Sequence, residues 1–199
     1  MLRINEIFYS LQGEGYNTGR AAVFVRFAGC NMRCPFCDTS YDTFREMTPE
    51  DIVKAIQQYP ARFIVLTGGE PTLQVDESFI DLLHRHNLEV AMESNGTRPA
   101  PRNIDWLTVS PKEQENLGQG TKALWRQPDE IKLVFDEQTD PDAVLSKTAF
   151  TVPAFCYLQP CDTGDPIRNA SIVNQCVNYI KQHPLWRLSL QTHKLAGFQ

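Results

Sequence analysis

The sequence predicts an α/β fold whose mostly parallel sheet curls into a partial barrel. Short runs of β-branched and aromatic residues recur along the chain, and amphipathic helical patterns lie between several of them. Many of these runs are apolar on both faces, as are strands of a parallel sheet that helices cover. Right-handed strand–helix–strand connections would then curl the sheet.

Seven segments are expected to form the strands of this sheet. Each is short and rich in apolar residues that suit a strand. The expected strands lie at 22–27, 62–67, 88–93, 105–110, 130–135, 154–159 and 186–191. The chain has no repeat, low-complexity tract or convincing linker, so a single domain over residues 1–199 is the simplest expectation.

Three segments carry the apolar periodicity of amphipathic helices. The first begins with Thr48 as a plausible N-cap and Pro49 at the first helical position, where a proline is well tolerated. Ile52, Val53 and Ile56 form its apolar stripe. The expected helices lie at 48–59, 76–86 and 169–183.

Composition and charge restrict the possible functions. Of the 199 residues, 42% are hydrophobic and 22% are charged, which is typical of a globular chain. The length falls below the roughly 250 residues of a complete eight-stranded barrel. The formal net charge of -5 gives no general reason to bind nucleic acid, whose ligands usually present a basic face. We therefore expect no nucleic-acid partner.

The N-terminal stretch and the cysteines indicate a cytoplasmic protein with no membrane partner. "MLRINEIFYS" lacks the apolar core of a signal peptide, and no stretch approaches the roughly 18 apolar residues of a membrane span. Without an export signal, cysteines are expected to be reduced thiols or metal ligands. The scattered Cys156, Cys161 and Cys176 are expected to be reduced packing residues.

Polar or glycine-rich strings follow five of the expected strands. They occupy residues 28–39, 67–71, 93–97, 110–112 and 159–162. In parallel α/β folds, the loops at the carboxyl ends of the strands converge on one mouth. The five strings are therefore expected to form one shared site.

The first of these strings places Cys30, Cys34 and Cys37 within eight positions. A structural zinc site needs four protein ligands, whereas an iron–sulfur cubane held by three thiolates leaves one iron open. His84 and His86 are two positions apart in a helical pattern and would point in different directions, so we expect both to be solvated. Structural zinc with a distant fourth cysteine remains an alternative.

The cysteine string resembles the signature of the radical S-adenosylmethionine (radical SAM) superfamily. The pattern is Cys30-x3-Cys34-x2-Cys37, with Phe36 just before the last cysteine, and "TGGEP" at 67–71 is similar to the second motif of that superfamily. The resemblance implies a partial (β/α)6 barrel and a [4Fe-4S] cluster on the three cysteines. It also implies that the open iron binds SAM, which is cleaved on reduction to a 5′-deoxyadenosyl radical.

A closer resemblance covers nearly the whole chain. The segment from "IFYSLQGEG" to "CPFCDTSY" is similar to the start of the 7-carboxy-7-deazaguanine synthases, and the later strings "SPK", "QPCD" and "LQTHK" also fit that family. The resemblance implies a lyase that converts 6-carboxy-5,6,7,8-tetrahydropterin into 7-carboxy-7-deazaguanine and ammonia, a step toward queuosine. It implies a radical-mediated, Mg²⁺-dependent ring contraction in which SAM is regenerated.

The same resemblance assigns a set of SAM-binding residues. Glu93 and Asn95 are expected beside them, although a turn or capping role suits Asn95 equally well. Cys161 departs from the family pattern, so its segment would act through its backbone and Asp162. The implied set is Phe36, Cys37, Asp38, Gly69, Ser110, Pro111, Lys112, Gln159, Pro160, Cys161 and Asp162.

The resemblance also assigns residues to the pterin and to magnesium. The substrate set is Leu11, Gln12, Gly13, Arg26, Thr67 and Gln199. Arg26 would bind the substrate carboxylate, for which a guanidinium is suited, or form a surface salt bridge instead. Glu14 would contact substrate or support the glycine turn. At the chain end, Gln199 departs from the proline or basic residue expected there.

Thr39 matches the magnesium ligand of the family. Its hydroxyl is a hard oxygen donor, and Mg²⁺ commonly keeps few protein ligands beside waters and substrate oxygens. The ion would link Thr39 to the substrate carboxylate. A threonine after an aspartate is otherwise usually a turn or cap residue.

The family also implies an external electron donor and a homodimer. Two other functions stay open: a radical SAM activase that acts on a partner protein, and a non-catalytic zinc or iron–sulfur module. Residues 112–129 have no clear period and are expected to form a long loop. Within that loop, Leu124 and Trp125 are expected to pack on the core rather than in a dimer contact.

Overall fold

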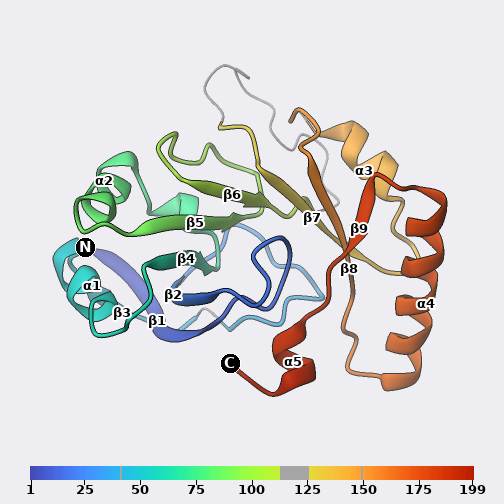
Figure 1. Cartoon of the computed structure of the whole chain (residues 1–199), viewed down its shortest axis with the longest axis horizontal. Helices are drawn as coiled ribbons and strands as arrows, with labels where there is room; N and C mark the ends of the chain where they lie inside the picture. Colours follow the sequence, from blue (N-terminus) through green and yellow to red (C-terminus); the bar gives the residue numbers. More distant parts are fainter. Residues whose placement is uncertain (41, 113–125, 149) are drawn as a thin grey trace.

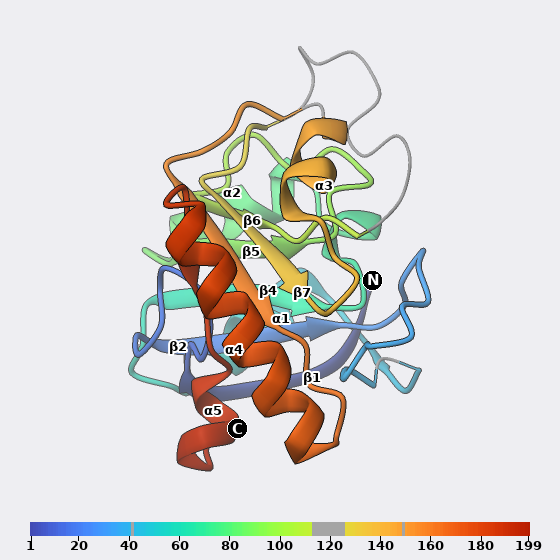
Figure 2. The same cartoon turned by 90° about the vertical axis from the view of Figure 1, so that its right-hand side faces the viewer.

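The computed structural model of the chain describes residues 1–40, 42–112, 126–148 and 150–199. A nine-stranded sheet runs through it in the order β3-β1-β2-β4-β5-β6-β7-β8-β9 (Figure 1). The sheet does not close on itself, and α1, α2, α3 and α4 lie along its outer side (Figures 1 and 2). Within the described ranges, no helix is long and apolar enough to cross a membrane.

The strand bounds agree closely with the seven segments expected from the sequence. The strands are β1 Leu2–Leu11, β2 Ala21–Phe27, β3 Arg45–Met47, β4 Phe63–Gly68, β5 Glu89–Ser94, β6 Trp106–Val109, β7 Glu130–Phe135, β8 Phe155–Pro160 and β9 Trp186–Leu188. All pairs from β2 to β9 are parallel, which confirms the expected sheet. The last strand ends at Leu188, three positions before the expected 191.

Two strands were not expected from the sequence, β1 and β3. β1 pairs antiparallel with both β2 and β3, and its register shifts between Ile4 and Glu6. Its residues are mostly half-buried, so it lacks the apolar run or strict alternation that marks a strand. β3 has only three residues, two of them exposed, and it therefore carries no apolar pattern of its own.

The helices are α1 Pro49–Ile56, α2 Glu77–Arg85, α3 Pro141–Lys147, α4 Pro166–Gln182 and α5 Thr192–Ala196, with a 3-10 turn η1 at Pro71–Leu73. The three expected helices are confirmed as α1, α2 and α4. The Thr48 side chain accepts a hydrogen bond from the Asp51 amide, so Thr48 is the N-cap of α1 as predicted.

The six-unit barrel that the resemblance implies is present in an incomplete form. Helices α1, α2, α3 and α4 cover the connections β2–β4, β4–β5, β7–β8 and β8–β9. The β5–β6 connection, all of which the structure describes, contains no helix. The short α3 and α5 were not expected, because neither is long enough to display a clear helical period.

The central strands are buried on both faces, as their sequences predicted. Val25 and Phe27 of β2 are fully buried in a core that includes side chains of α1 and α2. On the other face of β2, Ala22 and Phe24 pack with Val65 and Ala91. A further cluster packs β7 and β8 against α3 and α4. These cores hold the strand ends in place.

Two glycines after Leu66 allow the ends of β2 and β4 to lie very close together. Gly68 has φ +120°, and a Cβ on Gly69 would lie 1.9 Å from the Gly29 carbonyl oxygen. The Gly69 amide donates to the Phe27 carbonyl (3.0 Å), and the Glu70 amide donates to the Gly29 carbonyl (2.9 Å). The loop that carries the three cysteines is thereby hydrogen-bonded to the end of β4.

The acidic residue of the string "TGGEP", Glu70, has a structural role. Its side chain is fully buried and accepts four hydrogen bonds, which join η1 to the end of β5. The donors are the Thr72 amide and hydroxyl, the Ser94 hydroxyl and the Asn95 amide. A buried carboxylate is tolerated when its oxygens are satisfied in this way.

The C-terminal segment crosses the open side of the sheet. After β9, the amide of Thr192 donates to the Gly13 carbonyl at 3.0 Å, and the Gly15 amide donates to the Ser189 hydroxyl at 3.0 Å. Both glycines lie in the turn between β1 and β2. Figure 1 shows α5 beside this turn, away from the outer helices. The last strand is therefore linked to the first pair.

We expect Glu70→Ala to reduce the free energy of unfolding by about 3–5 kcal/mol, because it leaves several buried donors without an acceptor. Thr72→Val is the matched control: it removes one of the four donors and should cost only about 1 kcal/mol. Urea denaturation of the two variants measures both values. A Glu70→Ala variant as stable as Thr72→Val would contradict the central role of this carboxylate.

Candidate functional site

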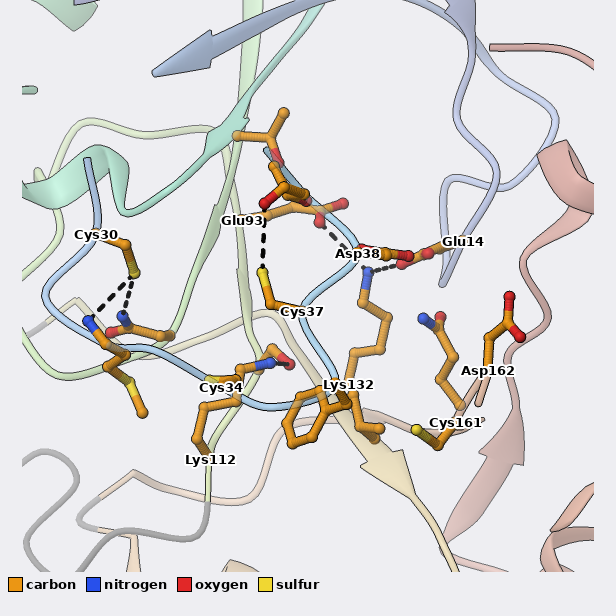
Figure 3. A pocket seen from close by; sticks show the side chains of 18 of the residues that line it. Glu14, Cys30, Cys34, Cys37, Asp38, Glu93, Lys112, Lys132, Cys161 and Asp162 are labelled. Carbon is orange, nitrogen blue, oxygen red and sulfur yellow. Dashed lines mark hydrogen bonds and ion pairs between the residues drawn. The ribbon is translucent and has the colours of Figure 1, made fainter. Parts of the chain in front are cut away.

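Two adjoining cavities open at the carboxyl ends of the parallel strands. The first has a volume of about 200 Å³, and all five of the strand-end strings line it (Figure 3). The second, of about 600 Å³, lies on the side of β1 and the β1–β2 turn. The expectation of one shared site is therefore confirmed. The cavities have in common Glu14, Asp38, Thr39, Thr67, Glu93 and Gln191.

The first cavity contains Cys30, Cys34 and Cys37, which all have free thiols (Figure 3). The Cys30 sulfur accepts a hydrogen bond from the Met32 amide at 3.4 Å. The Asn95 side-chain amide lies 4.0 Å from the same sulfur. Donors of this kind stabilise a thiolate that binds a metal.

The donor set fits an iron–sulfur cluster. Burial raises the pKa values of the Cys30 and Cys34 thiols, and the neighbouring cysteines raise them further. Thiolates at these two positions are therefore costly unless a cationic centre compensates them, which a metal cluster does. Thiolates are also the ligands that iron–sulfur clusters require.

The SAM-binding set predicted from the resemblance falls mostly into this cavity. Every member lines it except Pro111, which is buried and lines neither cavity. Lys112 lies 5.5 Å from the ring centre of Phe36, and its Nζ donates to the Ser110 hydroxyl at 2.7 Å. These contacts join the β6 end to the cysteine loop. The structure brings this set together, while its contacts with SAM stay a prediction.

Asp38 and Asp162 are both held by a lysine that the sequence reasoning missed. Lys194 of α5 contacts Asp38 at 3.1 Å and Asp162 at 2.8 Å. Hydrogen bonds from Lys194, the Gly164 amide and Asn169 lower the pKa of Asp162 to about 2. The C-terminal segment thus links the cysteine loop to the end of β8. The string "LQTHK" contains this lysine, but its pairing depends on the fold.

The predicted substrate residues lie along the second cavity. Leu11, Gln12, Gly13, Arg26, Thr67 and Gln199 all line it. Arg26 donates from Nε to Glu6 at 2.7 Å, so it forms the salt bridge considered as an alternative and also faces the cavity. Gln199 donates to the other oxygen of Glu6 at 3.3 Å. Glu6 therefore connects the chain end to Arg26.

Gln12, Glu14 and Glu93 belong to one hydrogen-bonded network with Lys132 of β7. The Gln12 amide donates to Glu93 at 2.9 Å, and Lys132 is paired with both Glu14 and Glu93. Glu14 therefore supports an ion pair, a role that neither of its two expected functions included. Lys132 was missed, although it is the only basic residue in the strand "EIKLVF".

The remaining expectations have mixed outcomes. Thr39 lines both cavities, where a magnesium ligand to the substrate would have to lie, but its metal role stays a prediction. Asn95 accepts a hydrogen bond from the Thr97 amide, as a turn residue would, and also lines the first cavity near Cys30, while a role toward SAM stays a prediction. His84 and His86, which were expected to be solvated, are both half-buried, and His84 is hydrogen-bonded to Asp105. Leu124 and Trp125 lie outside the described residues.

The other cysteines divide into two kinds. Cys156 and Cys176 are buried in the β7–β8 cluster, and burial raises the pKa of Cys176 to about 12. Both are packing residues, as expected. Cys161 packs against the same cluster but also lines the first cavity.

Comparisons with known proteins agree with this geometry. Residues 24–111 match the model of the radical SAM superfamily. The chain is 46% identical to the 7-carboxy-7-deazaguanine synthase of Bacteroides thetaiotaomicron, over all of both chains. It is 41% identical to the synthase of that name from Bordetella pertussis, covering 98% of this chain and 97% of the relative.

A solved structure also resembles the chain. The crystal structure of QueE from Escherichia coli matches with a TM-score of 0.77 and 30% sequence identity. The match covers 95% of this chain and 93% of the other. The likeness in fold therefore extends over both cavities.

We expect Lys194→Met to raise the pKa of Asp162 from about 2 toward the ordinary value of about 4. A lowered carboxyl pKa stabilises the fold above the unfolded pKa, and this contribution is lost as pH falls through the folded pKa. The stability difference between the two proteins should therefore be largest above about pH 4 and shrink on acidification. NMR titration of the Asp162 carboxyl carbon measures the shift directly.

Lys181→Met, which alters an exposed lysine in the last turn of α4, is the control for this titration. It should leave the Asp162 pKa unchanged. An unchanged pKa in Lys194→Met would show that Gly164 and Asn169 alone set it.

Proposed function

We propose the following reaction for this chain, which belongs to the 7-carboxy-7-deazaguanine synthase family of the radical SAM superfamily. It converts 6-carboxy-5,6,7,8-tetrahydropterin into 7-carboxy-7-deazaguanine and ammonia, as a step toward queuosine. The observation that carries the proposal is the pair of adjoining cavities, one with three cysteines and the other with Arg26. The residues that line both cavities would place the two reactants side by side.

Cys30, Cys34 and Cys37 would hold the [4Fe-4S] cluster, and its fourth iron would bind SAM. When bound, the cluster supplies the electron that cleaves SAM, and an external donor must deliver that electron. Asn95 and the Met32 amide face the Cys30 sulfur and would tune the centre through hydrogen bonds.

Residues at the strand ends would hold SAM beside the cysteines. Gly69 lines the cavity and has no side chain, which lets the Gly29 backbone pack against it and holds the cysteine loop beside the end of β4. Phe36 presents an apolar ring to the same cavity, which suits an adenine face. Ser110 and Asp162 add a hydroxyl and a carboxylate that can orient ribose or amino groups.

The second cavity would bind the carboxylated pterin. Arg26 gives its Nε to Glu6, which leaves the Nη groups for the substrate carboxylate. Gln12 and the backbone at Leu11 and Gly13 offer donors and acceptors to the amide edge of the ring. Thr67 lines both cavities and would contact the substrate where it faces SAM.

Magnesium would link Thr39 to the substrate carboxylate, where it stabilises charge during the ring contraction. Thr39 is half-buried and borders both cavities, which supports this role. A homodimer and a cytoplasmic location, both expected from the sequence, stay predictions.

We expect the anaerobically reconstituted protein to convert the pterin into the deazapurine when supplied with SAM, dithionite and Mg²⁺. Cys34→Ala should lose the cluster and all turnover, because one of three thiolate ligands is gone. Mass analysis of products and iron content measure the two effects. Cys156→Ala, which changes a buried thiol outside both cavities, is the control and should keep its iron.

The same assay discriminates between the possible functions. SAM cleavage without pterin turnover would favour an activase that acts on a protein. A protein that binds zinc and never cleaves SAM would contradict the proposed radical reaction.

Thr39→Ala should lower activity chiefly by raising the Mg²⁺ concentration needed for half-maximal rate, by about tenfold or more. Thr39→Ser keeps the hydroxyl and should remain within about threefold of the original value. Rates measured across a magnesium titration give both numbers. Equal magnesium dependence in Thr39→Ala and the unaltered protein would exclude Thr39 as a ligand.

A further inference from the structure

Lys132 is a buried charge that lines the first cavity and has no role in the reaction proposed above. Its ionic partners, Glu14 and Glu93, border both cavities. Its side chain is 6% exposed and extends from β7 toward the β1–β2 turn (Figure 3). There Nζ is paired with Glu14, and it lies 3.4 Å from Glu93 at the end of β5. One ammonium thus joins three separate parts of the fold.

Each of the two carboxylates also binds a glutamine amide. Glu93 accepts from Gln12 Nε2 at 2.9 Å, and Glu14 accepts from Gln191 Nε2 at 2.9 Å. The Gln12 carbonyl oxygen in turn accepts from the Glu14 amide at 3.1 Å. Both ends of the Gln12 side chain are therefore fixed, and Glu93 decides which end is the donor.

The hydrogen-bonded network around Lys132 depends on the positive charge of that residue. Three carboxylates, Glu14, Glu93 and Glu130, act on its charge, and Lys112 is a second cation close enough to interact with it. Burial alone would disfavour the ionised form of Glu14. Its pKa is nevertheless lowered, because Lys132 and hydrogen bonds from Lys132 and Gln191 outweigh that burial, with a smaller contribution from His193.

We propose that Lys132 is a positioning residue for the pterin: it holds Glu93 and Glu14 in place, and these carboxylates fix the amides of Gln12 and Gln191 that face the substrate. The proposal rests on the function proposed above. Pterins carry an amide and an amino group along one edge, and such an edge distinguishes sharply between a donor and an acceptor. Without the ammonium, Glu93 loses its ionic partner, so the Gln12 amide is held less firmly in its orientation.

Lys132→Met tests this role, because methionine fills a similar length without the charge. We expect the KM for the pterin to rise about tenfold or more, while reductive SAM cleavage in the absence of pterin stays within about twofold of the unaltered protein. A parallel loss of SAM cleavage would overturn the proposal, since it would place the effect on the cluster side or on the fold.

A double-mutant cycle measures whether Lys132 and Glu93 are coupled in pterin binding, which a purely structural role of Lys132 does not predict. If Lys132 acts through Glu93, the variant Lys132→Met/Glu93→Gln should bind pterin no more weakly than the worse single variant. Additive losses in the pterin kcat/KM would show independent roles and overturn the proposal.

A further variant covers the case in which Lys132→Met does not fold. Lys132→Met/Glu14→Gln removes one buried charge of each sign, which lessens the cost of an unpaired carboxylate. It should bind its cluster and still show the raised pterin KM, because Glu93 lacks its partner. An unaltered KM in this variant would overturn the proposal. Turnover by the unaltered protein tests the proposed reaction separately, since the role of Lys132 is judged only from ratios between variants.

Discussion

The close backbone contact between Gly69 and Gly29 is the constraint on which the site depends. It exists because Gly69 has no side chain, since a Cβ there would clash with the Gly29 carbonyl oxygen, and it ties the cysteine loop to the end of β4. Glu70 extends the same junction to β5 through its four accepted hydrogen bonds. The sheet thus fixes the start of the cysteine loop, which forms one wall of the first cavity.

The two cavities also differ in the charges that they offer to a ligand. The cysteine side would place a cationic cluster among thiolates, while the pterin side offers Arg26 to a carboxylate. Between them lie Glu14 and Glu93, two half-buried carboxylates that the buried Lys132 compensates. Buried charges of this kind are tolerated only when they are paired and hydrogen-bonded, so these side chains have little freedom to rearrange. A rigid divider suits a reaction whose two reactants must meet in one orientation.

The C-terminal segment completes the mouth from the opposite end of the sheet. Gln191 reaches Glu14 and Asp38, and Lys194 bridges Asp38 and Asp162. These bonds connect the turn after β1, the cysteine loop and the end of β8, which are far apart in the sequence. An open sheet leaves this side uncovered, and the segment after β9 covers it with polar contacts rather than with a further strand.

The sequence by itself determined the parallel strands, three helices and the five strings that form the site, because each depends on local pattern: apolar runs, capping residues and motif spacing. It also indicated the family, since the cysteine and glycine strings are contiguous. The antiparallel β1 and β3, the Lys132 network and the Lys194 bridge were decided only by the tertiary structure. β1 is about half-buried along its length and β3 has only three residues, so neither shows an apolar period of its own. An ion pair between residues over a hundred positions apart exists only after the sheet has brought them together, and no local pattern records that distance.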